Sequence, residues 1–193
     1  MNTRKVALVA ILTALSVGTN YAMVSIPNVK FMDFIVFVGG FCLGSLLGGL
    51  IGVLSWVVYG VLNPLGFSLG VWLATMFSEA IYGVAGGFIR KMFNKPMLES
   101  SRSGRINLGI FLGVVAVFLT LAYDIITTIV FWYAVPITAR SQTTLLAVIF
   151  FGVPFTIAHS LSNAVFFSIG SVPVINVISK VVRGGEKPVN VEK

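Results

Sequence analysis

The strongest constraint on the fold of this chain is an almost uninterrupted apolar stretch from Phe31 to Gly70. Glycines recur within it at every fourth position, at Gly40, Gly44, Gly48 and Gly52. As one helix, residues 31–62 would be about 48 Å long at 1.5 Å per residue, whereas a bilayer core is about 30 Å thick. The stretch therefore predicts two short helices, at about residues 31–47 and 48–62, and the glycine spacing predicts that they pack closely.

The composition indicates that the rest of the chain is also membrane-embedded. Hydrophobic residues make up 57% of the sequence and charged residues 10%, and the mean hydropathy is +1.00. Runs this apolar are not compatible with a water-soluble domain. The net charge of +7 comes from basic residues clustered in a few short stretches, as in cytoplasmic loops, so no nucleic-acid partner is expected. The single cysteine, Cys42, is expected to be a small packing residue.

The first predicted spanning helix, at about residues 5–22, carries two different faces. Small residues form one stripe, at Ala7, Ala10, Ala14 and Gly18. Polar residues form a second stripe, at Thr13, Ser16 and Asn20. A small-residue face lets another helix approach closely, and the polar face is expected to point into the protein. The segment also resembles a signal peptide, but it lacks the small residue three positions before the possible cleavage site, so a spanning helix is predicted.

Three further spans are predicted at about residues 71–89, 106–134 and 143–169, within a single membrane domain over residues 1–193 and with a polar tail from about residue 180. With six spans and a cytoplasmic N-terminus, all 13 basic residues except Lys30 and Arg140 lie on the cytoplasmic side. Five spans would place the basic cluster at residues 90–105 opposite the N-terminus, against the positive-inside rule. The sequence therefore predicts an all-α membrane protein with six transmembrane helices, both termini cytoplasmic, and short glycine-rich second and third helices.

Polar residues at three- and four-residue spacing mark one face on each of the last three predicted spans. The most polar positions on these faces are Glu79 and Tyr82, then Asp124 and Thr128, then His159 and Asn163. Ionisable groups at membrane depth are costly unless they are paired or hydrated, so they are candidates for function. One interpretation is a shared outward-facing cavity. The alternative is a structural network in which Glu79 or Asp124 pairs with His159.

The predicted substrate-binding residues share polar or aromatic side chains that can reach such a cavity. They are Glu79, Tyr82, Asp124, Thr128, His159, Asn163, Trp56, Trp132 and Asn63. Two carboxylates favour a cationic or amine-bearing ligand or a proton, and aromatic rings offer stacking or cation–π contacts. An anionic ligand is less suitable, because no basic residue is expected at this depth. Trp132 has a second interpretation, as part of an aromatic belt at the membrane interface.

No pattern of catalytic or metal-binding residues is present in the sequence. There is no phosphate-binding loop and no HExxH motif. A metal site built from Glu79, Asp124 and His159 is conceivable but lacks a diagnostic ligand spacing. We therefore expect neither an enzyme, nor a cofactor, nor a metal site.

The order of features along the chain resembles a known family. An AxxxA motif on the first helix, Ala10-Ile11-Leu12-Thr13-Ala14, is followed by a proline-containing outer loop, two short glycine-rich helices and a long basic connection before the fifth helix. Over about residues 4–180 this layout is similar to that of the substrate-binding S-components of energy-coupling factor (ECF) vitamin transporters.

The resemblance implies a subunit of an ABC importer in the plasma membrane of a prokaryote. Such a subunit binds a vitamin or related micronutrient in an outward-facing pocket, here capped by loops 24–30 and 63–70. It delivers the ligand inward together with a transmembrane coupling subunit and two cytoplasmic ATPases. Ala10 and Ala14 would contact the coupling subunit. The predicted pocket residues are similar in kind to those of thiamine-type pockets, which suggests a thiamine-like, cationic or amine-bearing ligand.

Two other functions remain open from the sequence. The chain could be a stand-alone secondary transporter in which Glu79 or Asp124 takes up a proton, although no inverted repeat is visible and six short spans leave little room for two gates. It could also be a membrane enzyme or assembly factor, which would require turnover that depends on the carboxylates.

Overall fold

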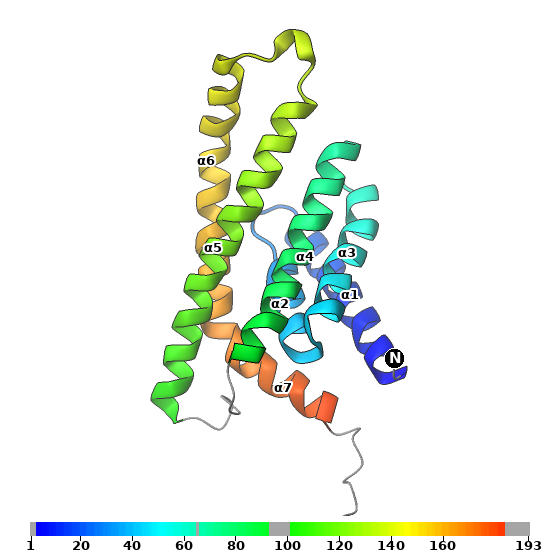
Figure 1. Ribbon diagram of the computed structural model, residues 1–193, viewed down its shortest axis with the longest axis vertical. Helices are drawn as coiled ribbons and strands as arrows, with labels where there is room; N and C mark the ends of the chain where they lie inside the picture. The colour runs from blue at the N-terminus through cyan, green and yellow to red at the C-terminus, as the bar shows by residue number, and fades with distance from the viewer. Residues whose placement is uncertain (1–2, 65, 93–100, 184–193) are drawn as a thin grey trace, which may run out of the picture.

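The computed structural model describes residues 3–64, 66–92 and 101–183, and every regular element in this part of the chain is helical (Figure 1). The main helices are α1 (Thr3–Ala22), α2 (Met32–Leu43), α3 (Ser45–Val61), α4 (Leu69–Met92), α5 (Arg102–Ala134), α6 (Gln142–Val165) and α7 (Ser171–Arg183). A short 3-10 turn, η2 (Ile137–Ala139), follows α5, and a π-helical turn, η3 (Phe166–Gly170), joins α6 to α7.

Four helical segments are long and apolar enough to cross a membrane. They are α1, α4, α5 and the continuous segment from Gln142 to Val182. The other two apolar helices are shorter: α2 has 12 residues and α3 has 17, which correspond to about 18 Å and 26 Å. The prediction of an all-helical membrane protein is therefore confirmed. The six-span arrangement remains a prediction.

The break between α2 and α3 lies at Gly44, three residues earlier than predicted. Gly44 has φ +100°, a conformation that side chains other than glycine rarely adopt, and its N–H caps α2 by donating to the Gly40 carbonyl. Gly44 therefore separates the two helices and is not one of the glycines that pack between them.

The other glycines of the ladder bring three helices together. A Cβ atom at Gly40 would lie 1.9 Å from the carbonyl oxygen of Gly83 on α4, and one at Gly48 would lie 2.3 Å from the Cα of Gly40. A Cβ at Gly83 would lie 2.1 Å from the carbonyl carbon of Gly48. The backbones of α2, α3 and α4 thus meet at a point where only glycine fits. Close packing of the two short helices was expected, but the participation of α4 was not.

The second half of the chain forms an antiparallel pair, α5 and α6, which rises beside the α1–α4 group (Figure 1). Helix α5 begins at Arg102, so Arg102 and Arg105 belong to its first turns and not to the preceding connection, and it ends at Ala134 as predicted. The last helical segment continues past residue 169, which the prediction left open. At η3 the chain turns, and α7 crosses beneath the other helices as far as Arg183.

Basic residues gather at the end of the molecule that α7 covers. The N-terminal end of α1, the C-terminal end of α4, the first turns of α5 and the end of α7 all lie there (Figure 1). They carry Arg4, Lys5, Arg90, Lys91, Arg102, Arg105 and Lys180. Arg140 lies at the opposite end, after η2. Three other basic residues of the predicted cytoplasmic side lie outside the described residues: Lys95, Lys187 and Lys193.

Helix α1 has the two faces that its sequence predicts. Ser16 and Asn20 are buried, whereas Ala10 and Ala14 are exposed on the opposite side. Gly18, which continues the small-residue stripe, has no atom within 4 Å of the position that a Cβ would occupy. The small-residue face is therefore not covered by any of the described residues at this position.

Candidate substrate-binding site

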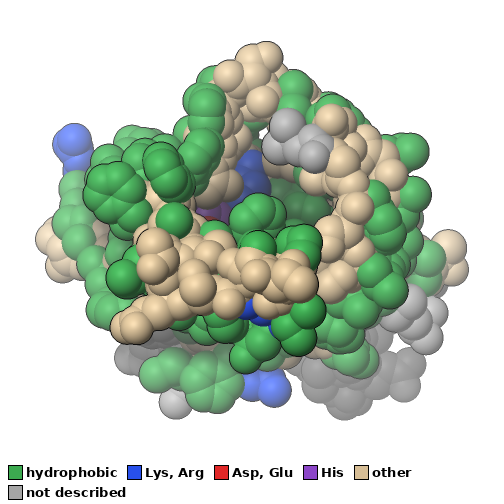
Figure 2. Space-filling model, turned by 90° about the horizontal axis from the view of Figure 1, so that it is seen from above, with side chains coloured by type: hydrophobic (Ala, Val, Ile, Leu, Met, Phe, Trp, Pro, Cys, Tyr) green, Lys and Arg blue, Asp and Glu red, His purple; other side chains and the backbone are tan. Residues whose placement is uncertain are grey.

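A cavity of about 840 Å³ lies between the α1–α4 group and the α5–α6 pair. Its volume falls within the range of small-molecule sites, about 300–1,000 Å³. Figure 2 looks into the hollow from the end opposite α7 and shows a basic side chain deep inside it. The walls are mainly apolar and aromatic: the first half of α6 forms one side, with Val148, Phe151 and Phe155, and Trp56 and Tyr59 on α3 form another.

The two predicted capping loops contribute differently. Residues 23, 24 and 26–30 of the loop after α1 all line the cavity, and Asn28 fastens this loop to α6 by donating from Nδ2 to the Phe155 carbonyl at 3.1 Å. From the loop after α3, Asn63 lines the cavity. Gly66, Phe67 and Ser68 instead line an adjoining cavity of about 350 Å³.

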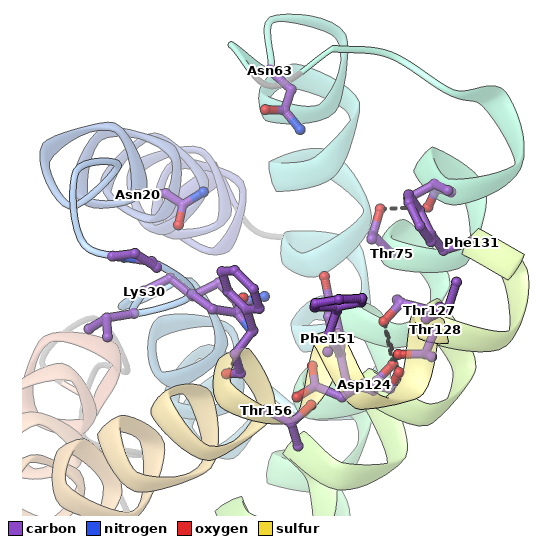
Figure 3. Close-up of a pocket in the computed structure, with 18 of the residues that line it drawn as sticks. Asn20, Lys30, Asn63, Thr75, Asp124, Thr127, Thr128, Phe131, Phe151 and Thr156 are labelled. Atoms are coloured by element: carbon purple, nitrogen blue, oxygen red, sulfur yellow. Dashed lines mark hydrogen bonds between the residues drawn. The ribbon is translucent and has the colours of Figure 1, made fainter. Parts of the chain in front are cut away.

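Lys30 and Asp124 are the charged residues among the described residues that line the large cavity (Figure 3). Lys30 is buried, with its Nζ 4.1 Å from the centroid of the Tyr123 ring and 5.9 Å from that of Trp56. Burial alone would lower the pKa of the Lys30 ammonium, but nearby acidic groups, Asp33 first among them, raise it above its ordinary value. Lys30 therefore stays protonated.

A chain of buried ionisable groups connects Lys30 to Asp124 behind the cavity wall. Lys30 Nζ lies 3.6 Å from Asp33 Oδ1, and Asp33 Oδ2 lies 2.5 Å from His159 Nε2. The other ring nitrogen, His159 Nδ1, lies 2.9 Å from Asp124 Oδ1. Each ring nitrogen of His159 therefore faces one carboxylate oxygen, that of Asp33 on one side and that of Asp124 on the other. The four groups form one continuous series from Lys30 to Asp124.

Further buried hydrogen bonds, made by uncharged side chains, fix this series of ionisable groups in place. Asn163 Nδ2 donates to Asp33 Oδ2 at 2.7 Å and to Thr120 Oγ1 at 2.9 Å, and the Tyr82 hydroxyl donates to the same threonine oxygen at 2.9 Å. Tyr82 and Asn163 are completely buried. These side chains therefore orient the charged groups and do not line the cavity themselves.

Glu79 is also completely buried and does not line the cavity. Its Oε2 accepts a hydrogen bond from Trp56 Nε1 at 3.2 Å, and the Trp56 carbonyl accepts one from Trp72 Nε1 at 2.8 Å. Glu79 thus acts on the cavity through the indole ring of Trp56, which forms part of the wall.

The structure divides the nine predicted site residues into three groups. Those that line the cavity are Trp56, Asn63, Asp124 and Thr128. Those in the buried layer behind it are Glu79, Tyr82, His159 and Asn163. Trp132 lies near the end of α5, with its ring 4.9 Å from that of Tyr133, and lines neither cavity.

Two important residues were missed by sequence reasoning, Lys30 and Asp33. The expectation that no basic residue lies at the depth of the pocket is wrong, because the loop after α1 folds inward and buries Lys30 against Asp33. The signal was present in the sequence: Asp33 is the only charged residue in the long apolar stretch after Phe31, and a basic residue stands three positions before it. The proposed pairing of Asp124 with His159 is observed, and Asp33 is a second partner.

The described residues contain no group of three or more His, Cys, Asp or Glu side chains arranged to hold a metal ion. The chain Asp33–His159–Asp124 is held together by hydrogen bonds between its own members. These side chains therefore form a fixed series of ionisable groups next to a largely apolar cavity.

Comparison with known families agrees with this architecture. The family model described as "ECF transporter, substrate-specific component" matches residues 4–170. No curated protein and no solved structure matches the chain. The match covers six of the seven α-helices, α1 to α6, and with them the cavity. Members of this family are transport proteins and work as multi-pass subunits in the plasma membrane. The chain therefore belongs to the family of substrate-specific components of ECF transporters.

Proposed function

We propose that this protein captures a vitamin-like micronutrient outside a prokaryotic cell and delivers it inward with a transmembrane coupling subunit and two cytoplasmic ATPases. The observation that carries the proposal is the cavity of about 840 Å³, which opens at the end of the molecule opposite the cluster of basic residues beside α7. Under the positive-inside rule the basic end is cytoplasmic, so the cavity faces outward.

The cavity supports binding of an amine-bearing ligand. Asp124 lines it, and its Oδ2 atom is buried without a hydrogen-bond partner among the described residues. A buried acceptor of this kind is stabilised when a ligand brings an N–H donor to it. The rings of Trp56, Tyr59 and Tyr123 offer faces on which the body of the ligand can stack.

The exposed small-residue face of α1 supports the contact with the coupling subunit. Ala10 and Ala14 lie one turn apart on this face, while the opposite side of α1 is buried against the rest of the protein. In a membrane, small residues let two helices approach closely enough for backbone contact. A bulky side chain at either position would keep the partner helix away without reaching the cavity.

Affinity purification of the tagged protein from its native membranes tests this proposal. We expect the coupling subunit and both ATPases to co-purify with the wild type and with the control Leu15→Trp, which changes an exposed residue on another side of α1. Ala10→Trp and Ala14→Trp should lose these partners and still retain any bound small molecule, as measured by mass spectrometry. Retention of the partners by both variants would contradict the proposed contact.

A stand-alone proton-coupled transporter would behave differently in the same cells. It would still accumulate its substrate when the ATPases are deleted, whereas an S-component would only bind it.

A further inference from the structure

The charged residues on the cavity wall also restrict which net charge the ligand can have. One lining residue is a cation, Lys30, and one is an anion, Asp124. They are the two ends of the buried series Lys30, Asp33, His159 and Asp124, in which each group lies 2.5–3.6 Å from the next. The inner members of this series do not line the cavity, so the groups of the series that face it are its two ends, an ammonium and a carboxylate.

Both ends have unused hydrogen-bonding capacity. The Lys30 ammonium has three N–H groups, and its polar neighbours are Asp33, whose Oδ1 lies 3.6 Å away, and the side chain of Tyr123, so one N–H group is left for a ligand. Asp124 uses Oδ1 for His159, whereas Oδ2 has no hydrogen-bond partner among the described residues although the side chain is about nine-tenths buried. One end therefore needs an acceptor from the ligand and the other needs a donor.

A ligand that carries a single charge can pair by charge with only one of these ends. A cation that pairs with Asp124 is repelled by Lys30, and an anion that pairs with Lys30 is repelled by Asp124. Such repulsion is strong in an apolar cavity because the surroundings screen it weakly. The other described residues of the wall are largely apolar and aromatic, including Phe151 and Phe155, and none of them carries a further charge to compensate.

We infer that the cavity selects a compound without net charge that brings an N–H donor to Asp124 and a carbonyl or carboxylate acceptor to Lys30 on a flat, largely apolar body. Zwitterions and neutral heterocycles with an amide-like edge share this chemistry. The inference rests on the proposed function and narrows it: the ligand bears an amine or N–H group but is not a net cation such as thiamine.

The first test compares probes that share a body and differ in charge. Thermal unfolding of the purified protein in mild detergent is measured with tryptophan, tryptamine and indole-3-propionate, and with nicotinamide, 1-methylnicotinamide and nicotinate. Riboflavin, pyridoxine, thiamine and biotin extend the set. We expect the largest rise in the unfolding temperature from an uncharged or zwitterionic probe. A larger rise from a cation or an anion, or no rise from any neutral probe, would overturn the inference.

The second test uses the sign of the effect of two substitutions on the affinity for the best probe. Both Lys30→Met and Asp124→Asn should weaken binding at least tenfold, because each removes one end of the pair. For a cationic ligand Lys30→Met would instead strengthen binding, and for an anion Asp124→Asn would do so; either result would overturn the inference. Lys91→Met, which removes a charge at the far end of α4, serves as the control and should leave the affinity unchanged.

Two further measurements separate a failure of binding from a failure of folding or of the proposed function. The charge-preserving variants Lys30→Arg and Asp124→Glu should retain more affinity than the neutral variants. A preference for cations would overturn this inference while leaving the transport role intact. That role fails if the coupling subunit and ATPases do not co-purify with the wild type.

Discussion

At the scale of single residues, His159 is the side chain whose contacts restrict it most. It is completely buried, and both of its ring nitrogens contact carboxylate oxygens, those of Asp33 on α2 and Asp124 on α5. His159 therefore joins three helices through one ring. Asp33 has additional partners in Lys30 and Asn163, whereas Asp124 depends on His159 for the hydrogen bond to its Oδ1.

Replacing His159 with alanine should destabilise the protein strongly. The change removes the hydrogen-bond partner of two buried carboxyl groups, and each buried polar group left without its partner costs about 1–3 kcal/mol. The measurement is thermal unfolding in detergent, with Ser160→Ala as the control, because the hydroxyl of Ser160 has no hydrogen-bond partner among the described residues. Equal stability of the two variants would show that the carboxylates do not need His159.

At the scale of helices, the packing of α2, α3 and α4 depends on backbone contact. Gly40, Gly48 and Gly83 come from three different helices and leave no room for a Cβ atom at any of the three positions. This contact also sets the height of α2, whose first turn carries Asp33, and of α4, which carries Glu79. The glycines thus help to position the buried charged groups behind the cavity.

Gly83→Ala should lower the free energy of unfolding by about 3 kcal/mol, because the added methyl group would collide with the backbone of α3 and the helices would have to separate. Gly70→Ala, on the same helix, is the matched control, since its Cβ would make an ordinary contact of 3.7 Å with a Val130 methyl group. Unfolding temperatures of both variants in detergent give the comparison. A Gly83 variant as stable as the Gly70 variant would contradict the close approach.

At the scale of the whole molecule, the cluster of basic residues and the mouth of the cavity lie at opposite ends. The basic residues lie where α1 and α5 begin and α4 and α7 end, and the cavity opens toward η2 (Figures 1 and 2). Arg90 also stabilises the basic end, because its guanidinium donates to the last carbonyls of α2, those of Phe41 and Cys42, at 3.1 and 2.6 Å. This polarity predicts an orientation with the cavity outside and both termini inside.

Cysteine labelling tests this orientation. In a Cys42→Ala background, Thr138→Cys lies in η2 and Ser103→Cys in the first turn of α5, and both positions are exposed. A membrane-impermeant maleimide should label Thr138→Cys in intact cells and Ser103→Cys only after the cells are permeabilised. The opposite pattern would reverse the orientation, and labelling of both positions in intact cells would exclude six spans with this topology.

Much of the architecture could be predicted from the sequence because it depends on local patterns. The faces of α1 and the end of α5 follow from residue spacing, and their observed positions agree with the predictions. The break at Gly44 was placed too late, because glycines that pack and a glycine that ends a helix look alike in the sequence. The turn at η3 was not predicted, because the chain stays apolar across it.

By itself, the sequence determined that this is a helical membrane protein with ionisable residues at membrane depth, since hydrophobic runs and residue periodicity are properties of the chain alone. Only the tertiary structure decided which of those residues meet the cavity. Lys30 and Asp124 line it, while Glu79 and His159 lie behind the wall. The physical reason is that residue spacing determines only which side of its own helix a side chain occupies. Which charged groups pair depends on the distances between several helices and one folded loop, and these distances are set by the tertiary packing.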